Sequence, residues 1–463
     1  MKVIETRNYD VVVVGAGSSG IAAAIAAAHN GAKTLLIDSG PMVGGELVSG
    51  LPVDGALNAR GEWIVGGVLR DLLEACKSLD GYIGPVFDWR LNYGVCFDPE
   101  IMKIAVIEAL ALAGVDTLLY TLAQEPIVSD GRIVGLMTVN KNGRSLITAD
   151  VFIDCSGDGD VAVNAGAPFE FGGPTGELQP VSLVFRIVGV EFERYLRYVR
   201  DHPEDFILAE NPIIEKSPAE CAAEVYAVGQ PFTVLSSHGR LMDEAIKAGR
   251  LFETTAMYMW PTSMARKEVA VNTTRISGFD ATDVRGLSGA LTTLTDQVNR
   301  GVKFLIENVP GFEDSFLSGI APRVGIRETR RVVGEYQLTG EDVLEGRKFA
   351  NGVAKGSHHV DLHGAGRDQV RIPVKDGRSY DIPFESLIPK GLSNTLIAGR
   401  CFSSDRQANG SARVMGPCMA MGQAAGTAAA IAAKEGLKDM RNVRIDSLRQ
   451  LISSQGGVVD GTH

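Results

Sequence analysis

The 463-residue chain predicts an α/β fold that contains a parallel sheet and, beyond it, a second α+β domain. Two observations support this prediction. Near the start, a short apolar strand, a glycine-rich turn, a helical pattern and a second apolar strand follow one another, as in a βαβ unit. The length suits two domains, and 45% of the residues are hydrophobic, enough for a large core. The sequence is therefore of the Rossmann-like α/β class.

The first strand and the turn after it carry the strongest signal. Tyr9–Val14 has the β-branched content of a buried strand. Gly15, Gly17 and Gly20 follow in the spacing G-x-G-x-x-G. The first glycine permits a tight turn, the second leaves room for a pyrophosphate at the backbone, and the third lets the next helix lie close to the sheet.

The helix and strand after this turn complete the motif. The helix is expected from about Ser18 to Asn30, so the free N–H groups near Ser18 and Ser19 point at the phosphates. The strand over 34–37 ends at Asp38, where a carboxylate can bind ribose hydroxyls. An ordinary βαβ turn would explain the glycines alone. It would not explain the strand before them, the helix after them and Asp38 together, so we expect a bound dinucleotide.

The residues after Asp38 indicate which dinucleotide binds. A turn that begins at Ser39 is followed by the pair Gly44-Gly45. In this respect the chain resembles flavoproteins with two dinucleotide-binding domains, in which a Gly-Gly pair lies against the FAD pyrophosphate and ribityl chain. The resemblance implies FAD as the cofactor, with Ser39, Gly44 and Gly45 among its contacts.

The next segment resembles the glutathione-reductase-type FAD-binding fold. Asp98 and Pro99 are the N-cap and first residue of a helix that is expected to run to about Ala113, and a strand is expected over 115–120. Asp-Gly and Asn-Gly pairs then mark hairpin turns of a β-meander insertion, which is typical of that fold. The meander strands are expected at 125–128, 133–139 and 145–148, and a strand at 151–154 returns to the main sheet.

Two later turns also resemble cofactor contacts of such flavoproteins. Residues 155–160 resemble their Ala-Thr-Gly-Asp turn, which implies that Gly157 and Asp158 contact the cofactor. A strand that begins at Thr395 runs into a turn with Gly399 and Arg400, which the resemblance also places at the cofactor.

The segment 413–433 is expected to form a turn and a helix of small residues. In the flavoproteins that the chain resembles, this helix points its N-terminus at the flavin pyrimidine edge, where the helix dipole stabilises negative charge on the reduced ring. Cys418 and Met419 would then lie beside the flavin. A redox role for Cys418 together with Cys401 needs a lowered thiol pKa, and a plain buried role is the commoner one for cysteine.

Taken as a whole, the chain resembles single-chain FAD-dependent oxidoreductases related to the fumarate reductase and succinate dehydrogenase flavoproteins. Such flavoproteins often have Glu where this chain has Asp38, and we expect the shorter side chain to serve. The family implies a class of chemistry but no substrate. The stretches that carry the resemblance are 152–162, 271–275, 325–336 and 413–426.

The motifs predict a discontinuous FAD-binding domain, residues 1–180 and 375–440, around a substrate or cap domain, residues 181–374. Residues 441–463 are expected to form a C-terminal helix and tail. Within the cap, we expect strands over 181–190 and 268–274, an exposed, largely helical stretch over 192–248, and one long helix over 287–308.

One absence bears on the mechanism. No second G-x-G-x-x-G occurs in a strand–turn–helix context, and Gly364-Ala365-Gly366 precedes no helical pattern. The chain is therefore expected to lack a dedicated NAD(P)H domain and to exchange a hydride between flavin N5 and a small polar or anionic substrate. Two alternatives stay open: a flavin-binding protein with a structural or regulatory FAD, and an NAD(P)H-using flavin monooxygenase. The electron acceptor is left open.

Three arginines are candidates for substrate binding. Arg327 and Arg331 are four residues apart, so on a helix they would share a face and could clamp a carboxylate. The alternative is a solvated or ion-paired stripe with Glu328 and Glu335. Arg413 precedes the helix expected at the flavin and could bind the substrate or the flavin carbonyls.

The sequence HHVDLH places His358, His359 and His363 close to Asp361. The spacing suits metal ligation only on a helix, and the nearby Pro373 and glycines indicate a loop, so no metal site is predicted. A general acid/base role is more plausible for one of these histidines, with His359 as the candidate, because imidazole titrates near neutral pH. A purely structural loop is the alternative.

Composition narrows the class of protein. The formal net charge of −11 makes a nucleic-acid partner improbable. No apolar stretch is long and unbroken enough for a membrane span, and the first residues lack the apolar centre of a signal peptide. Six scattered cysteines without C-x-x-C spacing indicate neither a zinc site nor a disulfide scaffold. We expect a cytoplasmic enzyme that acts on a small-molecule substrate, and we leave open whether it is a homo-oligomer.

Overall fold

The computed structural model describes residues 3–461, and its largest sheet is built on the predicted βαβ unit. Its parallel part has the strand order β6-β2-β1-β9, and β21 also pairs with the end of β9. These strands are β1 (Val3–Val14), β2 (Thr34–Ile37), β6 (Asp116–Leu118), β9 (Gly143–Asp154) and β21 (Thr395–Ile397). The strands expected after the glycine turn and near the C-terminus are thus present.

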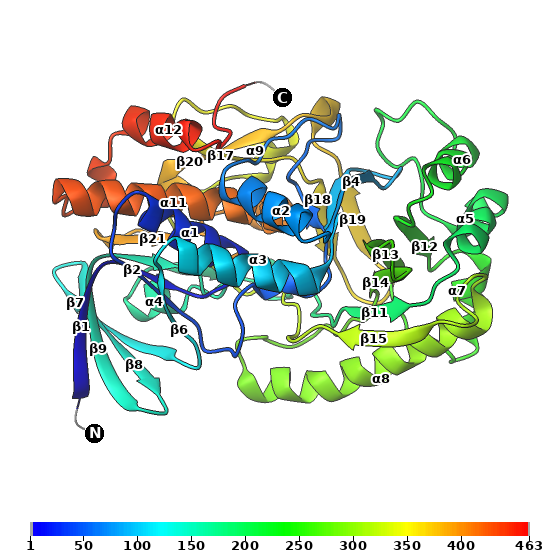
Figure 1. Cartoon of the computed structure of the whole chain (residues 1–463), viewed down its shortest axis with the longest axis horizontal. Coiled ribbons are helices and arrows are strands. Elements are labelled where there is room, and N and C mark those ends of the chain that lie inside the picture. Colours follow the sequence, from blue (N-terminus) through cyan, green and yellow to red (C-terminus); the bar gives the residue numbers. More distant parts are fainter. Residues whose placement is uncertain (1–2, 462–463) are drawn as a thin grey trace.

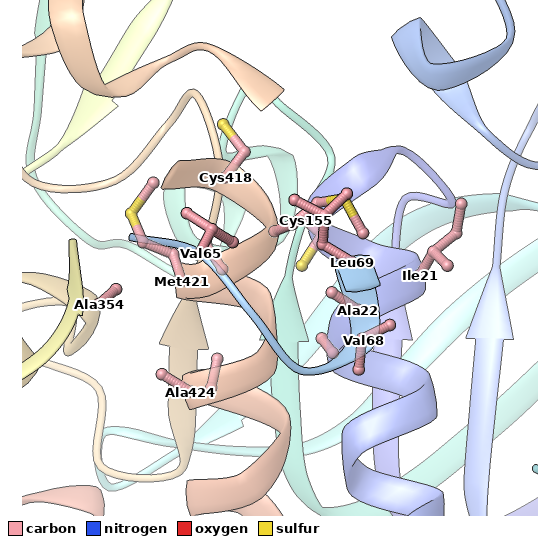
Figure 2. Packing of buried hydrophobic residues seen from close by; sticks show 14 of the residues in the cluster. Ile21, Ala22, Val65, Val68, Leu69, Cys155, Ala354, Cys418, Met421 and Ala424 are labelled. Atoms are coloured by element: carbon pink, nitrogen blue, oxygen red, sulfur yellow. The ribbon is translucent and has the colours of Figure 1, made fainter. Parts of the chain in front are cut away.

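Two helices of small residues cover one face of this sheet. The helices α1 (Ser18–His29) and α11 (Met415–Glu435) lie side by side in Figure 2 and belong to one hydrophobic core. Glycines on α11 permit the close approach, because a Cβ added to Gly422 would lie 2.1 Å from the carbonyl oxygen of Ser19. Gly426 makes the same approach one turn later. The small residues of both helices are therefore a packing requirement.

The predicted meander extends the same sheet on its other side. The strands β7 (Leu122–Ser129) and β8 (Arg132–Asn140) pair in antiparallel fashion, and β8 pairs with the first half of β9. The sequence suggested separate strands over 145–148 and 151–154. They form one strand, because β9 continues without a break from the meander into the parallel sheet.

A second sheet lies at the opposite end of the long axis of the molecule (Figure 1). It is antiparallel, with the order β12-β13-β14-β11-β15, and the long helix α8 (Val284–Asn308) packs its buried side chains into the same core. The strands are β11 (Phe185–Val188), β12 (Thr233–Ser236), β13 (Ala256–Ser263), β14 (Glu268–Asn272) and β15 (Phe316–Ile320). The long helix and two of the strands match the prediction.

Residues 192–248 are not entirely helical. They contain three α-helices and also the strand β12, so the prediction of a largely helical stretch is only partly correct. The pairing of β12 with β13 depends on residues more than twenty positions away, which local periodicity does not reveal. The helices are α5 (Phe192–Asp201), α6 (Pro218–Val228) and α7 (Arg240–Lys247).

In the sequence, a small antiparallel sheet of order β3-β5-β4 is inserted between β2 and β6 of the main sheet, and helices α2 and α3 belong to the same stretch (Figure 1). Asp98 caps α3 as predicted, because its side chain accepts a hydrogen bond from the backbone N–H of Glu100. The elements are β3 (Val53–Asp54), β4 (Tyr82–Phe87), β5 (Tyr93–Phe97), α2 (Val68–Ser78) and α3 (Pro99–Leu112).

Three two-stranded antiparallel ribbons occupy the stretches around the arginine and histidine motifs. Residues 325–336 do not form the helix on which Arg327 and Arg331 would share a face, and residues 360–363 form a strand where a loop was expected. The ribbons are β10 (Phe169–Phe171) with β16 (Arg330–Val332), β17 (Gly352–Gly356) with β20 (Tyr380–Pro383), and β18 (Val360–His363) with β19 (Gln369–Ile372).

The remaining helices are short or peripheral. Among the described residues, no helix is long and apolar enough to cross a membrane. Side chains of 338–388 pack in the same core as α1 and α11, and the domain limits given above stay predictions. The remaining helices are α4 (Asp160–Asn164), α9 (Gly340–Leu344), α10 (Arg406–Ala412) and α12 (Ile445–Ser454).

Candidate functional site

The glycine turn leaves an open space in front of α1. A Cβ added to Gly17 would have no atom of the chain within 4 Å, whereas one added to Gly20 would lie 1.7 Å from the carbonyl oxygen of Gly15. No side chain caps the first N–H groups of α1, which begin at Ser18 and Ser19. Gly20 therefore permits close packing. Gly17 keeps the free N–H groups at the start of α1 accessible, and we call this open turn the cradle.

Asp38 is held at the edge of this cradle by the backbone. The N–H of Ala16 donates to Oδ2 over 2.7 Å, and the N–H of Gly40 donates to Oδ1 over 2.6 Å. The guanidinium of Arg323 lies 3.9 Å from Oδ1, so a cation that the sequence did not single out joins the group. The carboxylate keeps lone pairs for hydroxyl donors.

The Gly-Gly pair closes the other side of the cradle. The N–H of Gly44 donates to the carbonyl of Ala16 over 2.8 Å, and a Cβ added to Gly45 would lie 2.8 Å from the Cα of Gly17. Both glycines have positive φ, which side chains rarely adopt. Ser39 is exposed beside this pair.

The turns at 155–160 and 398–400 meet in one ion pair. Arg400 donates to Asp158 over 2.8 Å and to the hydroxyl of Thr329 over 2.6 Å. Burial alone would raise the pKa of Asp158, but Arg400 and Thr329 outweigh it and hold the pKa below its ordinary value. A Cβ on Gly157 would lie 2.8 Å from the guanidinium, and one on Gly399 would lie 2.5 Å from Oγ of Ser19.

The N-terminus of α11 is packed against the end of β3. A Cβ added to Gly416 would lie 2.5 Å from the backbone of Gly55. Cys418 is buried with its thiol near the carbonyl of Arg413, and burial raises its pKa to about 12, so the thiolate needed for redox chemistry is disfavoured. Met419 packs in the main core.

A cavity of about 180 Å³ opens beside this helix end. Its walls come from segments far apart in the sequence and are rich in charged and aromatic side chains. The polar lining residues are Glu46, Asp54, Arg90, Ser182, Tyr258, Asn272, Arg327, His358, His359, Asp361, His363, Gln369, Arg400 and Arg413.

The histidine motif lies on the cavity wall and is neutral there. The rings of His358 and His359 stack with centroids 3.9 Å apart. Burial lowers the pKa of His358 and of His363 to about 4 and that of His359 well below its ordinary value. Nδ1 of His359 is buried without a hydrogen-bond partner. These rings are better suited to hydrogen bonding than to accepting protons at neutral pH.

Asp361 organises one side of the cavity. Its Oδ2 accepts from Nε2 of His363 over 3.0 Å and lies 3.4 Å from Nη2 of Arg413, and its Oδ1 accepts from Gln369 over 2.6 Å. Burial alone would raise its pKa, yet the interaction with His363 and the charge of Arg413 hold the pKa well below the ordinary range. This carboxylate is thus fully engaged.

Arg327 is a half-buried cation without a carboxylate partner in the described chain. It donates to the carbonyl of Pro180 over 2.8 Å and to the hydroxyl of Ser182 over 3.1 Å, and no ion pair joins it to any residue of 3–461. Burial and the neighbouring Arg413 lower its pKa to about 10. Arg275, which lines an adjoining small cavity with Arg327, likewise has no carboxylate within ion-pair distance in the described chain.

Comparison with known proteins agrees with this geometry. The model of a family described as "FAD dependent oxidoreductase" matches residues 10–452. The chain belongs to this family.

This FAD-dependent oxidoreductase has partial matches among characterised proteins. A stretch of 107 residues is 35% identical to 3-oxosteroid 1-dehydrogenase of Mycobacterium tuberculosis, covering 22% of the chain and 18% of that protein. A stretch of 203 residues is 27% identical to the tRNA uridine 5-carboxymethylaminomethyl modification enzyme MnmG of Streptococcus agalactiae, covering 41% of the chain and 30% of that protein. The matches span less than a third of these relatives.

Solved structures resemble the enzyme more loosely. A geranylgeranyl bacteriochlorophyll reductase-like protein from Thermoplasma acidophilum aligns over 98% of the chain and 85% of its own, with a TM-score of 0.44 and 15% identity. The flavin-dependent brominase Bmp2 aligns over 96% and 83%, with a TM-score of 0.48 and 12% identity.

The cradle fits the cofactor of the family, FAD. Gly17 leaves the space that a pyrophosphate needs, the uncapped start of α1 offers N–H donors, and Asp38 can accept from ribose hydroxyls. We expect Gly15, Gly20 and the Gly44-Gly45 pair to shape this cradle. The individual contacts of the other predicted residues stay predictions.

The structure separates the predicted catalytic residues. Arg327, Arg413 and His359 line the cavity together, but Arg331 does not. Arg331 is buried elsewhere, where it pairs with Glu328 over 2.8 Å and donates to the carbonyl of Gly172. The ion-paired alternative for this arginine is therefore the one the structure supports.

Several cavity residues had no signal in the sequence. Asp54 and Arg90 come from the end of β3 and from the turn before β5, and only the fold brings them together. Arg275 belongs to a stretch that carried the family resemblance, but without a stated role.

No group of three or more His, Cys, Asp or Glu side chains that could hold a metal ion occurs within residues 3–461. His363 is engaged with Asp361, and His358 bonds to a backbone carbonyl.

Proposed function

We propose that this FAD-dependent oxidoreductase exchanges a hydride with a small, anionic, polar substrate bound in the cavity at the N-terminus of α11. The observation that carries the proposal is Arg327, a half-buried cation that lines the cavity and pairs with no carboxylate of the described chain. Burying an unpaired charge is costly, so an anion from outside the chain is its natural partner.

The surroundings of Arg327 support a small carboxylate. The adjoining cavity is lined by Arg275 together with threonine hydroxyls, so two guanidinium groups can act on one anionic group. Nη1 of Arg275 is buried without a hydrogen-bond partner. Because the cavity measures about 180 Å³, the part of the substrate that enters it is a few heavy atoms in size.

The rest of the cavity can orient the substrate. FAD, when bound, supplies a two-electron acceptor or donor at flavin N5. Asp361 fixes Arg413 and His363 on one wall, and Tyr258 lies on the facing strand β13 with its hydroxyl donating to Gln369 over 2.9 Å. Neutral histidines can donate to or accept from an uncharged oxygen or nitrogen of the substrate.

The architecture supports direct exchange with the substrate. Within residues 3–461, every sheet other than the main one is antiparallel, and Gly364–Gly366 form the tip of the β18–β19 ribbon. A dedicated NAD(P)H domain would need a second βαβ unit. We therefore favour a dehydrogenase, oxidase or reductase over an NAD(P)H-dependent monooxygenase.

Anaerobic absorbance spectra test the proposal. Purified enzyme with bound FAD is mixed with hydroxy acids, amino acids, amines, polyols, NADH and NADPH in turn. Bleaching of the flavin bands by an anionic compound, without rapid bleaching by either nicotinamide, is the expected result. Rapid bleaching by NADPH alone would favour the monooxygenase, and a flavin inert to the whole panel would favour a structural or regulatory FAD.

A further inference from the structure

Asp54 stands at the end of β3, where the cavity meets the N-terminus of α11. The next residue, Gly55, packs so tightly on this helix that a Cβ there would lie 2.9 Å from Pro417 and 3.0 Å from Val414. Asp54 itself lines the cavity. If α11 faces the flavin as the family resemblance implies, this carboxyl lies at the end of the cavity where the chemistry takes place.

Asp54 has no partner in the described chain. No hydrogen bond or ion pair from residues 3–461 reaches its carboxyl, and Oδ1 is buried without a donor next to Gly94. The contrast with Asp361 is sharp, because three side chains contact that carboxylate. A carboxyl left without partners in a buried site is expensive to keep unless it takes up protons or bonds to a ligand.

The charges around Asp54 come from three elements. Asp88 and Arg90 face it from the turn between β4 and β5, Asp361 from β18, and the buried thiol of Cys96 from β5. Burial and Asp88 raise the pKa of Asp54 to about 7, and the opposing effect of Arg90 is smaller. A carboxyl that titrates near neutral pH both accepts and returns a proton readily.

We propose that Asp54 is the proton acceptor for the substrate, an assignment that rests on the proposed function. A substrate with hydrogen on a carbon and on the attached oxygen or nitrogen loses two electrons and two hydrogens. The carbon-bound hydrogen leaves with both electrons as a hydride to oxidised FAD, the proton on oxygen or nitrogen passes to the Asp54 carboxylate, and a C=O or C=N bond forms. In the reductive direction, protonated Asp54 returns the proton.

Two other groups compete for this role. Glu46 also lines the cavity, but it follows directly after the Gly44-Gly45 pair, on the side expected to hold the cofactor. The histidines on the wall have their pKa lowered by burial, to about 4 for His358, so they are weak acceptors near pH 7. These competitors define the variants needed for the test.

The first arm of the experiment needs no substrate. The enzyme with bound FAD is labelled with carboxyl-¹³C aspartate and titrated from pH 4 to pH 9 by NMR or difference infrared spectroscopy. One aspartate carboxyl is expected to titrate near pH 7 and to be missing in Asp54→Asn. If no aspartate titrates in this range, or if the signal survives in Asp54→Asn, the assignment is wrong.

The second arm follows the rate of anaerobic flavin bleaching against pH, with the panel compound that bleaches the wild type. The wild-type rate should rise with a limb near pH 7. In Asp54→Asn the rate should fall about 100-fold or more and lose this limb, because a positioned base contributes about 10²–10⁴-fold. Glu46→Gln is expected to keep the limb, and its loss there would assign the role to Glu46 and overturn the proposal.

The outcomes separate the two proposals. If no compound bleaches the wild type, the proposed function fails, whereas bleaching that Asp54→Asn leaves unchanged refutes only the role of Asp54. Should Asp54→Asn fail to bind FAD or to fold, the wild-type rate profile decides, because a flat profile between pH 5 and 9 contradicts a base that titrates near 7. Asp54→Glu, which keeps the carboxyl, should recover part of the rate.

Discussion

The charged residues of this chain differ in whether the side chain has a partner of opposite charge. This difference indicates which of them stabilise the fold and which are available to a ligand. Arg331 is buried and Arg327 is half-buried, and both belong to the same motif. The first pairs with Glu328 over 2.8 Å, while the second has only neutral acceptors. Spacing in the sequence made them look equivalent, but their contacts assign one to stability and the other to the cavity.

Arg331→Gln is expected to destabilise the enzyme without changing substrate binding. Removing one member of a buried pair leaves Glu328 with less compensation, which costs about 3 kcal/mol in the free energy of unfolding. Chemical denaturation with saturating FAD measures the loss, and the half-saturating concentration of the bleaching compound should stay within twofold of the wild type. A large change in that concentration would place Arg331 in the site.

Asp54→Asn is expected to change how stability depends on pH. The folded pKa of about 7 lies above the ordinary 3.8, so the folded enzyme keeps a proton that the unfolded chain releases between about pH 4 and 7. Wild-type stability therefore falls as the pH rises through this window, and the loss persists above it.

The asparagine variant lacks this loss. It should be more stable than the wild type by roughly 4 kcal/mol at pH 8 and by little at pH 4, from about 1.4 kcal/mol for each unit of pKa shift. Denaturation curves of both proteins at the two pH values give the difference. Parallel curves at both pH values would show that Asp54 does not carry the raised pKa.

At the scale of elements, the sequence predicted the glycine turn and its helix well, because these depend on close contacts between glycines and nearby backbone. The G-x-G-x-x-G spacing, the helix after it and Asp38 describe a local unit, so its structure could be predicted from the residues themselves. The helix of small residues near the C-terminus could be predicted too. Its contact with α1 depends on two elements almost 400 residues apart and was not foreseen.

Gly17→Ala is expected to weaken FAD binding while leaving the apoprotein intact. The φ of Gly17 is −77°, which alanine adopts freely, and an added Cβ meets no atom of the chain within 4 Å. The methyl group would instead occupy the space in front of α1 that a pyrophosphate needs. FAD titration should show at least tenfold weaker binding with an unchanged Tm of the apoprotein. Equal FAD affinity would contradict the cradle.

Gly422→Ala is expected to destabilise the packing of α11 on α1. The added Cβ would lie 2.1 Å from the carbonyl oxygen of Ser19, so one helix must move, and overpacking of this kind costs about 1–3 kcal/mol. Gly289→Ala is the matched control, because this glycine of α8 has no atom within 4 Å of an added Cβ. Thermal denaturation should show a lower Tm in the first variant and an equal or higher Tm in the second.

Two predictions of secondary structure were wrong for the same physical reason. Residues 330–332 form β16 because they pair with β10, about 160 positions earlier, and residues 360–363 form β18 because they pair with β19. The charged run with four-residue spacing favoured a helix at the first stretch, and the glycines favoured a loop at the second. In both stretches tertiary pairing overrides the local preference.

At the scale of the whole molecule, the cavity is a product of the fold. Its walls come from β3, the turn before β5, β13, β18 and the start of α11, which belong to both larger cores and to the small sheet (Figure 1). The sequence could therefore indicate the class of chemistry, and three of the four predicted catalytic residues line the cavity. Asp54 and Arg90 could not be predicted, since no local pattern marks them.

The measurement that tests the central claim most directly is anaerobic flavin bleaching in the wild type and in Arg327→Gln. We expect an anionic compound to bleach the wild type and its half-saturating concentration to rise about 30-fold or more in the variant, because loss of one partner of a buried charge pair costs about 2–5 kcal/mol. An uncharged compound that bleaches both proteins at the same concentration would contradict the anionic substrate, and bleaching by NADPH alone would contradict direct exchange with the substrate.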